Sequence, residues 1–360
     1  MRRALASALG VLSIVTLSAD PSRADCTAHG DAPAIPQADA IPGQSNPPQC
    51  AGGGQLVTRT VAGESRTACV YLPNSAIAAN TTSPLPLVVY LHPSLFTADT
   101  LEFATNVLEY QNSANLSDDS SRPGFLLVAP EGRNTNHYYP SPDDKGTGWD
   151  NWYRNTDPND PAENVDIRTI DDFIAYMQAT YAVDSDRIFV TGWSNGSAMA
   201  YLYGLMRPSI ASVAVYSAPD PFAAFNDPCK QTPVAHAPAD DSEIQIANVG
   251  LPVMHVHNDC DIAGLCPNGE RLERRLSTQG VFIQDAVIDS AMLPANGCLD
   301  ACGTDPDADA NPGTSSDPMK EATSLAGISL GTGNHVRWPQ GWTLPMLDFF
   351  RTHPRSARAH

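Results

Sequence analysis

The chain has 360 residues and a formal net charge of −19 at pH 7. This length can hold one large α/β domain or two small ones. A strongly acidic chain repels nucleic acid and anionic membrane surfaces, so neither is expected as a partner. Past the N-terminal segment, no stretch reaches the roughly 18 apolar residues that a membrane span needs. We expect a monomer with no membrane anchor.

Residues 1–24 have the pattern of a secretory signal peptide. A basic start is followed by an apolar segment and by Ser22-Arg23-Ala24, which resembles a signal-peptidase site. The pattern predicts cleavage before Asp25 and an extracellular protein. Cys26 comes next, but the residues before it make a poor lipobox, so no lipid anchor is expected.

The cysteines indicate an oxidising compartment. Eight are present, an even number, and the paired C-x-x-C or C-x-x-H spacings of a zinc site are absent. Cys260/Cys266 and Cys298/Cys302 are close enough to close local loops, and Cys26 could close the N-terminal arm with Cys50. The pattern favours disulfides but does not fix their connectivity.

The folded domain is predicted to begin near Gln55. Residues 25–54 are rich in Pro, Ala and Gly and form a predicted surface arm, and 55–360 are predicted to be one catalytic domain. The predicted elements, in chain order, are a hairpin over 55–73 that turns at Ala62-Gly63-Glu64, buried strands over 84–94 and 124–132, an amphipathic helix over 165–183, a strand over 188–190, a helix over 197–203, strands over 211–217, 251–258 and 325–331, and a helix over 343–353. Alternating strands and helices predict an α/β fold with a mostly parallel central sheet flanked by helices.

One short stretch suggests catalysis. Gly192-Trp193-Ser194-Asn195-Gly196 is a G-x-S-x-G sequence between a predicted strand and a predicted helix. In a nucleophile elbow this turn presents a serine hydroxyl at the top of a sheet. A serine that merely caps a helix is the alternative, because short motifs also occur by chance.

The chain order of the other polar residues supports the catalytic interpretation. A serine nucleophile needs a histidine base and an acid, in the order Ser, Asp, His in α/β-hydrolases. His335 lies in a Gly-rich loop after the last predicted strand, where a triad histidine is expected. Asp261 follows the strand at 251–258 and is the preferred acid, with Asp259 and then Asp220 as alternatives.

Two backbone N–H groups must stabilise the oxyanion of acyl transfer. Asn195, the residue after the serine, should supply one. The loop after the strand at 84–94 should supply the other; because Pro93 has no N–H, Ser94 is expected to donate, with Leu95 as the alternative. His92 is expected to hold this loop by hydrogen bonds.

These motifs resemble the secreted polyhydroxybutyrate depolymerase and feruloyl esterase family of α/β-hydrolases. The resemblance spans roughly residues 55–352 and is carried, in order, by "LHPS", Pro130-Glu131-Gly132, "GWDNWYRN", the helix and elbow over 165–199, "HVHNDCD" and Gly333-Asn334-His335 followed by Trp338-Pro339. It implies an α/β-hydrolase fold and places the family's acid on Asp261. The chain departs from the pattern at Pro93, where the family has glycine, and over 262–330, which form a longer cysteine-bearing excursion.

Aromatic residues near the elbow are candidates for substrate binding. Trp149, Trp152, Tyr153 and Trp193 could line an apolar groove for an acyl chain or an aromatic acid. Trp338 could line it too or wedge the histidine loop. The alternative is that such rings simply pack beneath loops.

Two other clusters could suggest a metal. His255 and His257 leave one strand on the same side, but no third histidine is in register, so buried hydrogen-bonded histidines are expected. Acidic residues alternate over 305–311 like oxygen ligands of Ca²⁺, but the glycine and distal glutamate of an EF-hand are missing. We expect a solvated acidic loop there, and no metal or cofactor.

The sequence therefore predicts a secreted serine esterase. Ser194, His335 and Asp261 are its expected triad. The favoured substrate is a polyester of the poly(3-hydroxybutyrate) type. Alternatives are feruloyl or acetylxylan esters of plant cell walls, aromatic polyesters, or a non-catalytic polymer-binding role for the same fold.

Overall fold

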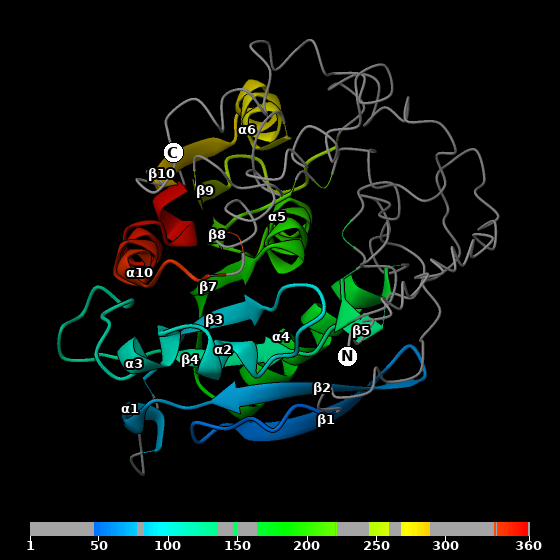
Figure 1. Ribbon diagram of the computed structural model, residues 1–360. Helices are drawn as coiled ribbons and strands as arrows, with labels where there is room; N and C mark the ends of the chain where they lie inside the picture. The colour runs from blue at the N-terminus through cyan, green and yellow to red at the C-terminus, as the bar shows by residue number, and fades with distance from the viewer. Residues whose placement is uncertain are drawn as a thin grey trace, which may run out of the picture.

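The computed structural model describes residues 47–77, 83–134, 147–149, 151, 164–219, 221, 245–258, 268–288, 335 and 337–358. Its centre is an eight-stranded sheet with the strand order β1-β2-β4-β3-β7-β8-β9-β10 (Figure 1). The strands are β1 (Gln55–Val61), β2 (Glu64–Tyr71), β3 (Leu85–Leu91), β4 (Leu126–Pro130), β7 (Val183–Trp193), β8 (Ser212–Tyr216), β9 (Pro252–Asn258) and β10 (Phe282–Ile288). The pairs β1–β2 and β2–β4 are antiparallel, and every other pair in the sheet is parallel.

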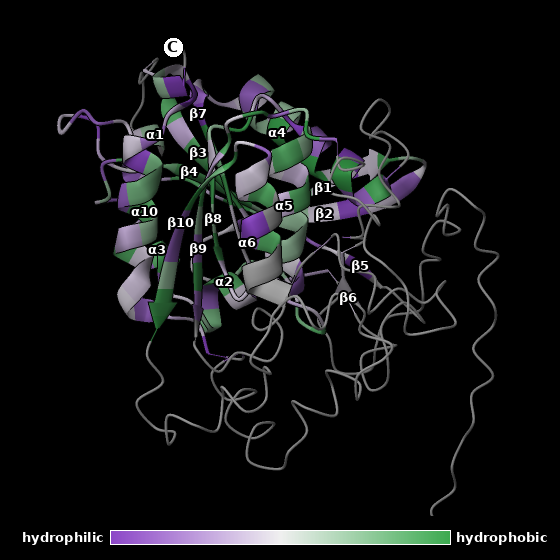
Figure 2. Ribbon diagram, turned by 90° about the horizontal axis from the view of Figure 1, so that it is seen from above, coloured by the Kyte–Doolittle hydropathy of each residue, from purple (hydrophilic) through white to green (hydrophobic). Residues whose placement is uncertain are grey.

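Helices cover both faces of this sheet. They are α1 (Asn74–Ile77), α2 (Thr100–Phe103), α3 (Val107–Tyr110), α4 (Val165–Thr180), α5 (Asn195–Met206), α6 (Asn268–Thr278) and α10 (Thr343–Thr352), with 3-10 turns η4 (Gln340–Trp342) and η5 (Arg355–Arg358). Figure 2 shows α4, α5 and α6 on one side of the strands and α3 and α10 on the other. A small hairpin of β5 (Arg133–Asn134) and β6 (Thr147–Gly148) forms a separate sheet.

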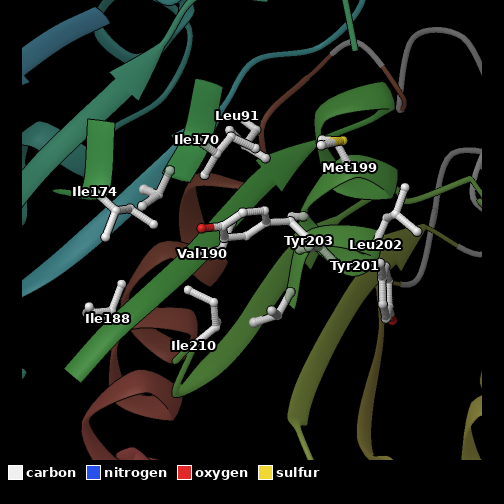
Figure 3. Close-up of a cluster of buried hydrophobic side chains, with 14 of the residues drawn as sticks. Leu91, Ile170, Ile174, Ile188, Val190, Met199, Tyr201, Leu202, Tyr203 and Ile210 are labelled. Carbon is white, nitrogen blue, oxygen red and sulfur yellow. The ribbon is translucent and has the colours of Figure 1, made fainter. Parts of the chain in front are cut away.

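The strands divide their side chains between two cores because successive residues of a strand point to opposite faces. On β3, Leu87 and Val89 belong to the core under α4 and α5, whereas Val88 and Tyr90 belong to the core under α10. Figure 3 shows side chains from β3, β7, α4 and α5 meeting in the first of these cores. All twelve residues of α5 are buried, as expected for a helix that lies in the middle of a layer.

The local chemistry explains where α4 begins. Asn164 has an extended backbone, and its side-chain oxygen accepts hydrogen bonds from the N–H groups of Asp166 and Ile167. This is an N-cap that satisfies two donors of the first turn. The apolar stripe of the helix then packs on the sheet through Ile167, Ile170 and Phe173. The helix predicted over 165–183 is confirmed, ending at Thr180.

Three expectations change in the light of this structure. Cys50 is bonded to Cys69 of β2, and so not to Cys26. The excursion over 262–330, expected within the domain, contains two elements that were not predicted: α6, which packs on the sheet, and β10, which forms its last parallel strand. The helix after Ser194 is also longer than predicted, because Asn195 and Gly196 already belong to it.

The other predicted strands and helices are present at the expected places in the chain. The strand expected over 325–331 lies outside the described residues. None of the helices in the described ranges is both long and apolar enough to cross a membrane. The predicted fold class, an α/β-hydrolase fold with a mostly parallel sheet flanked by helices, is confirmed by the strand order and the two helical layers.

Candidate active site

Ser194 occupies a strained turn between β7 and α5. Its backbone angles are φ 54° and ψ −122°, a conformation that non-glycine residues rarely adopt. The turn passes close to β3: a Cβ atom on Gly196 would lie 2.2 Å from the carbonyl oxygen of Leu91, and one on Gly192 would lie 2.4 Å from that of Gly196. Glycine is therefore required at both flanking positions.

The end of β8 holds this turn in place. The N–H of Ser194 donates to the carbonyl oxygen of Tyr216 at 3.0 Å. The hydroxyl of Ser197, in the first turn of α5, donates to the same oxygen at 2.6 Å. Because β8 is the parallel neighbour of β7, these two hydrogen bonds fix the turn to the carboxyl end of β8.

His335 lies directly against the serine hydroxyl. The Nε2 atom of His335 is 2.7 Å from the Oγ atom of Ser194. If Nε2 accepts the serine proton, the neutral ring must carry its own hydrogen on Nδ1. The carbonyl oxygen of His335 accepts a hydrogen bond from the indole nitrogen of Trp193 at 2.7 Å, which anchors the histidine backbone beside the elbow.

Ser217 is a residue of this site that the sequence analysis missed. Its Oγ atom is 2.6 Å from Nδ1 of His335, on the opposite side of the ring from Ser194. It is fully buried, has a positive φ of 60°, and donates its N–H to the carbonyl oxygen of Val256 at 2.8 Å. The signal in the sequence was its position, directly after a buried strand that neighbours the nucleophile strand.

The loop expected to supply an oxyanion donor is built around buried His92. The Nε2 atom of His92 accepts the N–H of Gly132 at 2.8 Å, so Nδ1 carries the hydrogen and donates to the carbonyl oxygen of Pro93 at 2.8 Å. Burial lowers the pKa of His92 to about 4, so the ring is neutral at pH 7. The loop-holding role expected for His92 is confirmed.

Two residues of the turn after β4 support the same loop. A carboxylate oxygen of Glu131 accepts the N–H of Ala98 at 2.7 Å, and burial raises the pKa of Glu131 to about 8. A Cβ atom on Gly132 would lie 2.4 Å from the carbonyl oxygen of Gly148, so only glycine fits beside the β5–β6 hairpin. The Pro130-Glu131-Gly132 motif thus supports the loop after β3.

The two expected oxyanion donors lie in the turn after β3 and at the start of α5. Ser94 lies in the turn after β3, and the N–H of its neighbour Leu95 donates to the carbonyl oxygen of Thr147 at 2.8 Å, which leaves Ser94 as the better donor of the pair. Asn195 is the first residue of α5, and backbone N–H groups in a first helical turn have no acceptor within the helix. Its side chain makes two hydrogen bonds with the backbone of Trp149, at 2.7 Å and 3.2 Å.

The aromatic residues are packed more deeply than a groove lining requires. Trp149 has no exposed surface, and its indole nitrogen donates to the carbonyl oxygen of His92 at 2.9 Å. Trp193 and Trp338 are each 3% exposed and meet edge to face, with ring centroids 6.0 Å apart. Trp149 thus packs against the loop of His92, and Trp193 holds the backbone of His335 and contacts Trp338, while the groove lining expected of all three stays a prediction. Trp152 and Tyr153 lie outside the described residues.

The candidates for the acid of the expected triad are not among the described residues. Asp261 and its alternatives Asp259 and Asp220 all lie outside the described residues, as does the acidic loop over 305–311. The geometry in hand is thus a serine on a strained turn, a histidine against it, and a hydroxyl on the far side of the histidine.

The comparisons with known proteins concern the fold. No family model matches the chain, and no curated protein matches its sequence. An S-formylglutathione hydrolase from Agrobacterium tumefaciens is similar over 89% of this chain and 99% of its own, with 14% identity and a TM-score of 0.48. A ferulic acid esterase is similar over 79% of this chain and 98% of its own, with 15% identity and a TM-score of 0.45. A carboxylesterase from Mesorhizobium loti is similar over 65% of this chain and 89% of its own, with 17% identity and a TM-score of 0.40.

Proposed function

We propose that the chain is a serine esterase in which Ser194 is the nucleophile and His335 is the general base. The observation that carries the proposal is the 2.7 Å contact between the Oγ atom of Ser194 and the Nε2 atom of His335, formed on a strained strand-to-helix turn. The alternative was a serine that merely caps the helix. The Ser194 side chain makes no capping hydrogen bond, and a cap would need neither the strained turn nor the histidine.

The proposed reaction proceeds through an acyl-enzyme. His335 takes the hydroxyl proton as the Oγ atom of Ser194 attacks the ester carbonyl carbon, and the resulting imidazolium gives that proton to the leaving alcohol. The N–H groups of Asn195 and Ser94 are the proposed donors to the oxyanion. Water, activated by His335 in the same way, then releases the acid and restores Ser194.

A carboxylate is still required beside the imidazolium, because a hydroxyl such as that of Ser217 cannot balance its charge. We propose Asp261 for this role. Asp261→Asn should then lower kcat about 10⁴-fold, while Asp259→Asn and Asp220→Asn should cost far less. If Asp259→Asn or Asp220→Asn is the crippling change, the acid is that residue.

We further propose that the protein is exported and acts on a polyester of the poly(3-hydroxybutyrate) type. The signal-peptide pattern of residues 1–24 and the motif resemblance over 55–352 support this choice. The Cys50–Cys69 bond is consistent with folding in an oxidising compartment.

The test of the chemistry is labelling by a fluorophosphonate probe. The oxidised protein should be labelled on one serine, and Ser194→Ala should not be labelled. Ser212→Ala is a matched control at a buried serine of β8 whose hydroxyl has no hydrogen-bond partner among the described residues, and its labelling should persist. Failure of the folded wild type to label would overturn the proposal and favour the non-catalytic, polymer-binding alternative.

The test of the substrate compares three esters. We expect soluble acid from amorphous poly(3-hydroxybutyrate) and little turnover of methyl ferulate or acetylated xylan, with Ser194→Ala as the blank. Turnover of ferulate or xylan acetate alone would overturn the polyester assignment while leaving the esterase mechanism in place.

A further inference from the structure

Two buried histidines lie on the face of β9 opposite the core that contains Trp193 and Trp338. His255 and His257 are two residues apart, so both point toward α5 and α6, on the same face as Val253. Their rings are 4.9 Å apart between centroids, and His255 also meets the edge of Tyr201 from α5. The mechanism proposed above uses neither of them.

Each histidine faces a carboxylate from a different element. The Nδ1 atom of His255 is 2.7 Å from a carboxylate oxygen of Glu273 on α6. The Nε2 atom of His257 is 2.9 Å from a carboxylate oxygen of Asp285, the residue of β10 that pairs with His255 in the strand register. The four side chains offer one ligand atom each, and these atoms all lie within 4.8 Å of one another.

The two carboxylates of this cluster have no lysine or arginine beside them. In the described part of the chain, each forms an ion pair only with its histidine. Two carboxylates this close to one another repel, and a cation held between them would relieve that repulsion.

A divalent cation is the simplest group that would neutralise Glu273 and Asp285 together. It would lie where the four ligand atoms converge.

We propose that His255, His257, Glu273 and Asp285 bind one divalent transition-metal ion, with Zn²⁺ as the first candidate. Two imidazoles and two carboxylates form a donor set of four, the number that Zn²⁺ takes in structural sites, and imidazole ligands favour such ions over Ca²⁺ or Mg²⁺. The Nδ1 atom of His255 and the Nε2 atom of His257 already face the two carboxylates, so one ion between them could take one atom from each side chain.

The position of the site indicates a structural role. Within the described sheet β10 is the edge strand and has β9 as its one neighbour, while α6 covers that edge (Figure 1). An ion held by β9, β10 and α6 would fasten this edge to the domain. The sequence analysis set the histidine pair aside for want of a third histidine, because it did not foresee that α6 and β10 return to the sheet beside them.

The experiment measures binding and not hydrolysis, so its outcome is independent of the esterase proposal. Oxidised protein without an affinity tag is treated with a chelator to remove bound metal and is then titrated with Co²⁺. Binding is monitored by the visible absorption of four-coordinate Co²⁺. The Co²⁺ is finally displaced with Zn²⁺. Asp285→Asn is the main variant, because its side chain is 41% exposed and its loss should not prevent folding. His257→Gln is the second variant, and His353→Gln and Asp172→Asn are controls outside the cluster.

We expect one equivalent of Co²⁺ in the wild type, in both controls and in Ser194→Ala, displaced by Zn²⁺, with a rise in Tm on adding Zn²⁺. Binding should weaken at least about tenfold in Asp285→Asn and in His257→Gln. Two results would overturn the proposal: no stoichiometric binding by the wild type, or binding by Asp285→Asn as tight as that of the wild type. In either case the cluster is a pair of metal-free histidine–carboxylate hydrogen bonds.

Discussion

The Oγ atom of Ser217 lies 2.6 Å from the Nδ1 atom of His335. The nucleophile contacts the other nitrogen of the same ring, at 2.7 Å. The histidine is thus held between two serines, one at the carboxyl end of β7 and the other at that of β8. Since the Ser194 hydroxyl must give its proton to Nε2, the neutral ring carries its hydrogen on Nδ1, where the Ser217 oxygen can accept it beside the proposed carboxylate and help to hold the ring in place.

Ser217→Ala should therefore lower kcat/KM by about 10- to 100-fold. This range corresponds to the loss of one hydrogen bond to a charged group, which contributes about 1.5–3 kcal/mol. Loss of this acceptor also disfavours the protonated ring, so the acid limb of the pH–kcat/KM profile should move to lower pH. Ser212→Ala is the matched control: Ser212 is a buried serine of β8 whose hydroxyl has no hydrogen-bond partner among the described residues. A profile for Ser217→Ala that coincides with the control would show that Ser217 does not act on the histidine.

Gly196→Ala should disrupt the elbow. The added Cβ would lie 2.2 Å from the carbonyl oxygen of Leu91 and 2.5 Å from that of His92, and backbone atoms cannot move aside as a flexible side chain can. We expect a loss of stability of about 3 kcal/mol or more, with little serine labelling in the fraction that folds. Gly341→Ala is the control, because a Cβ there meets nothing within 4 Å. Equal Tm values for the two variants would contradict this account of the turn.

The sequence predicted the parts of the site that depend on local patterns. The elbow is recognisable because a buried strand, a glycine-flanked serine and a helix follow one another within a few residues. The hairpin and α4 were equally readable from turn chemistry and periodicity.

Other parts depend on contacts between distant segments and could not be read in this way. Ser217 becomes significant only when β8 pairs with β7 and His335 returns from 118 residues away. Trp149, expected to line a groove, is a second example. Its indole nitrogen donates to the carbonyl oxygen of His92, 57 residues earlier in the chain, and that contact is not visible in the sequence. Residue type alone does not distinguish a ring that lines a pocket from one that supports a loop.

The Cys50–Cys69 disulfide should contribute about 3 kcal/mol to stability, because it closes a loop of about twenty residues in the unfolded chain. The double variant Cys50→Ala/Cys69→Ala is preferred to either single one, since a lone thiol could pair elsewhere. Urea unfolding without reductant gives the free energy. The carboxylate of Asp99 also holds this segment, through the N–H groups of Gln49 and Cys50 at 2.9 Å and 2.8 Å, so the fold should persist. An unchanged unfolding midpoint would show that the cross-link is energetically neutral.

Glu131 should make the protein less stable as the pH rises. Burial raises the pKa of Glu131 from 4.5 to about 8, so between these values the folded chain holds a proton that the unfolded chain releases. The free energy of unfolding then falls with rising pH, by up to about 1.4 kcal/mol per pH unit from this group. The stabilising effect is complete below about pH 4.5 and is lost as the pH passes about 8.

Glu131→Gln removes this titration while keeping an oxygen that can accept the N–H of Ala98. The difference between the free energies of unfolding of Glu131→Gln and the wild type should therefore grow in favour of the variant from pH 5 to pH 8. Titrations of other groups, including His92, cancel in that difference because both proteins contain them. Glu109→Gln, at an exposed glutamate of α3, provides the baseline. Parallel curves for Glu131→Gln and the wild type would mean that Glu131 is ionised in the folded protein, and that its contact with Ala98 is a charged one.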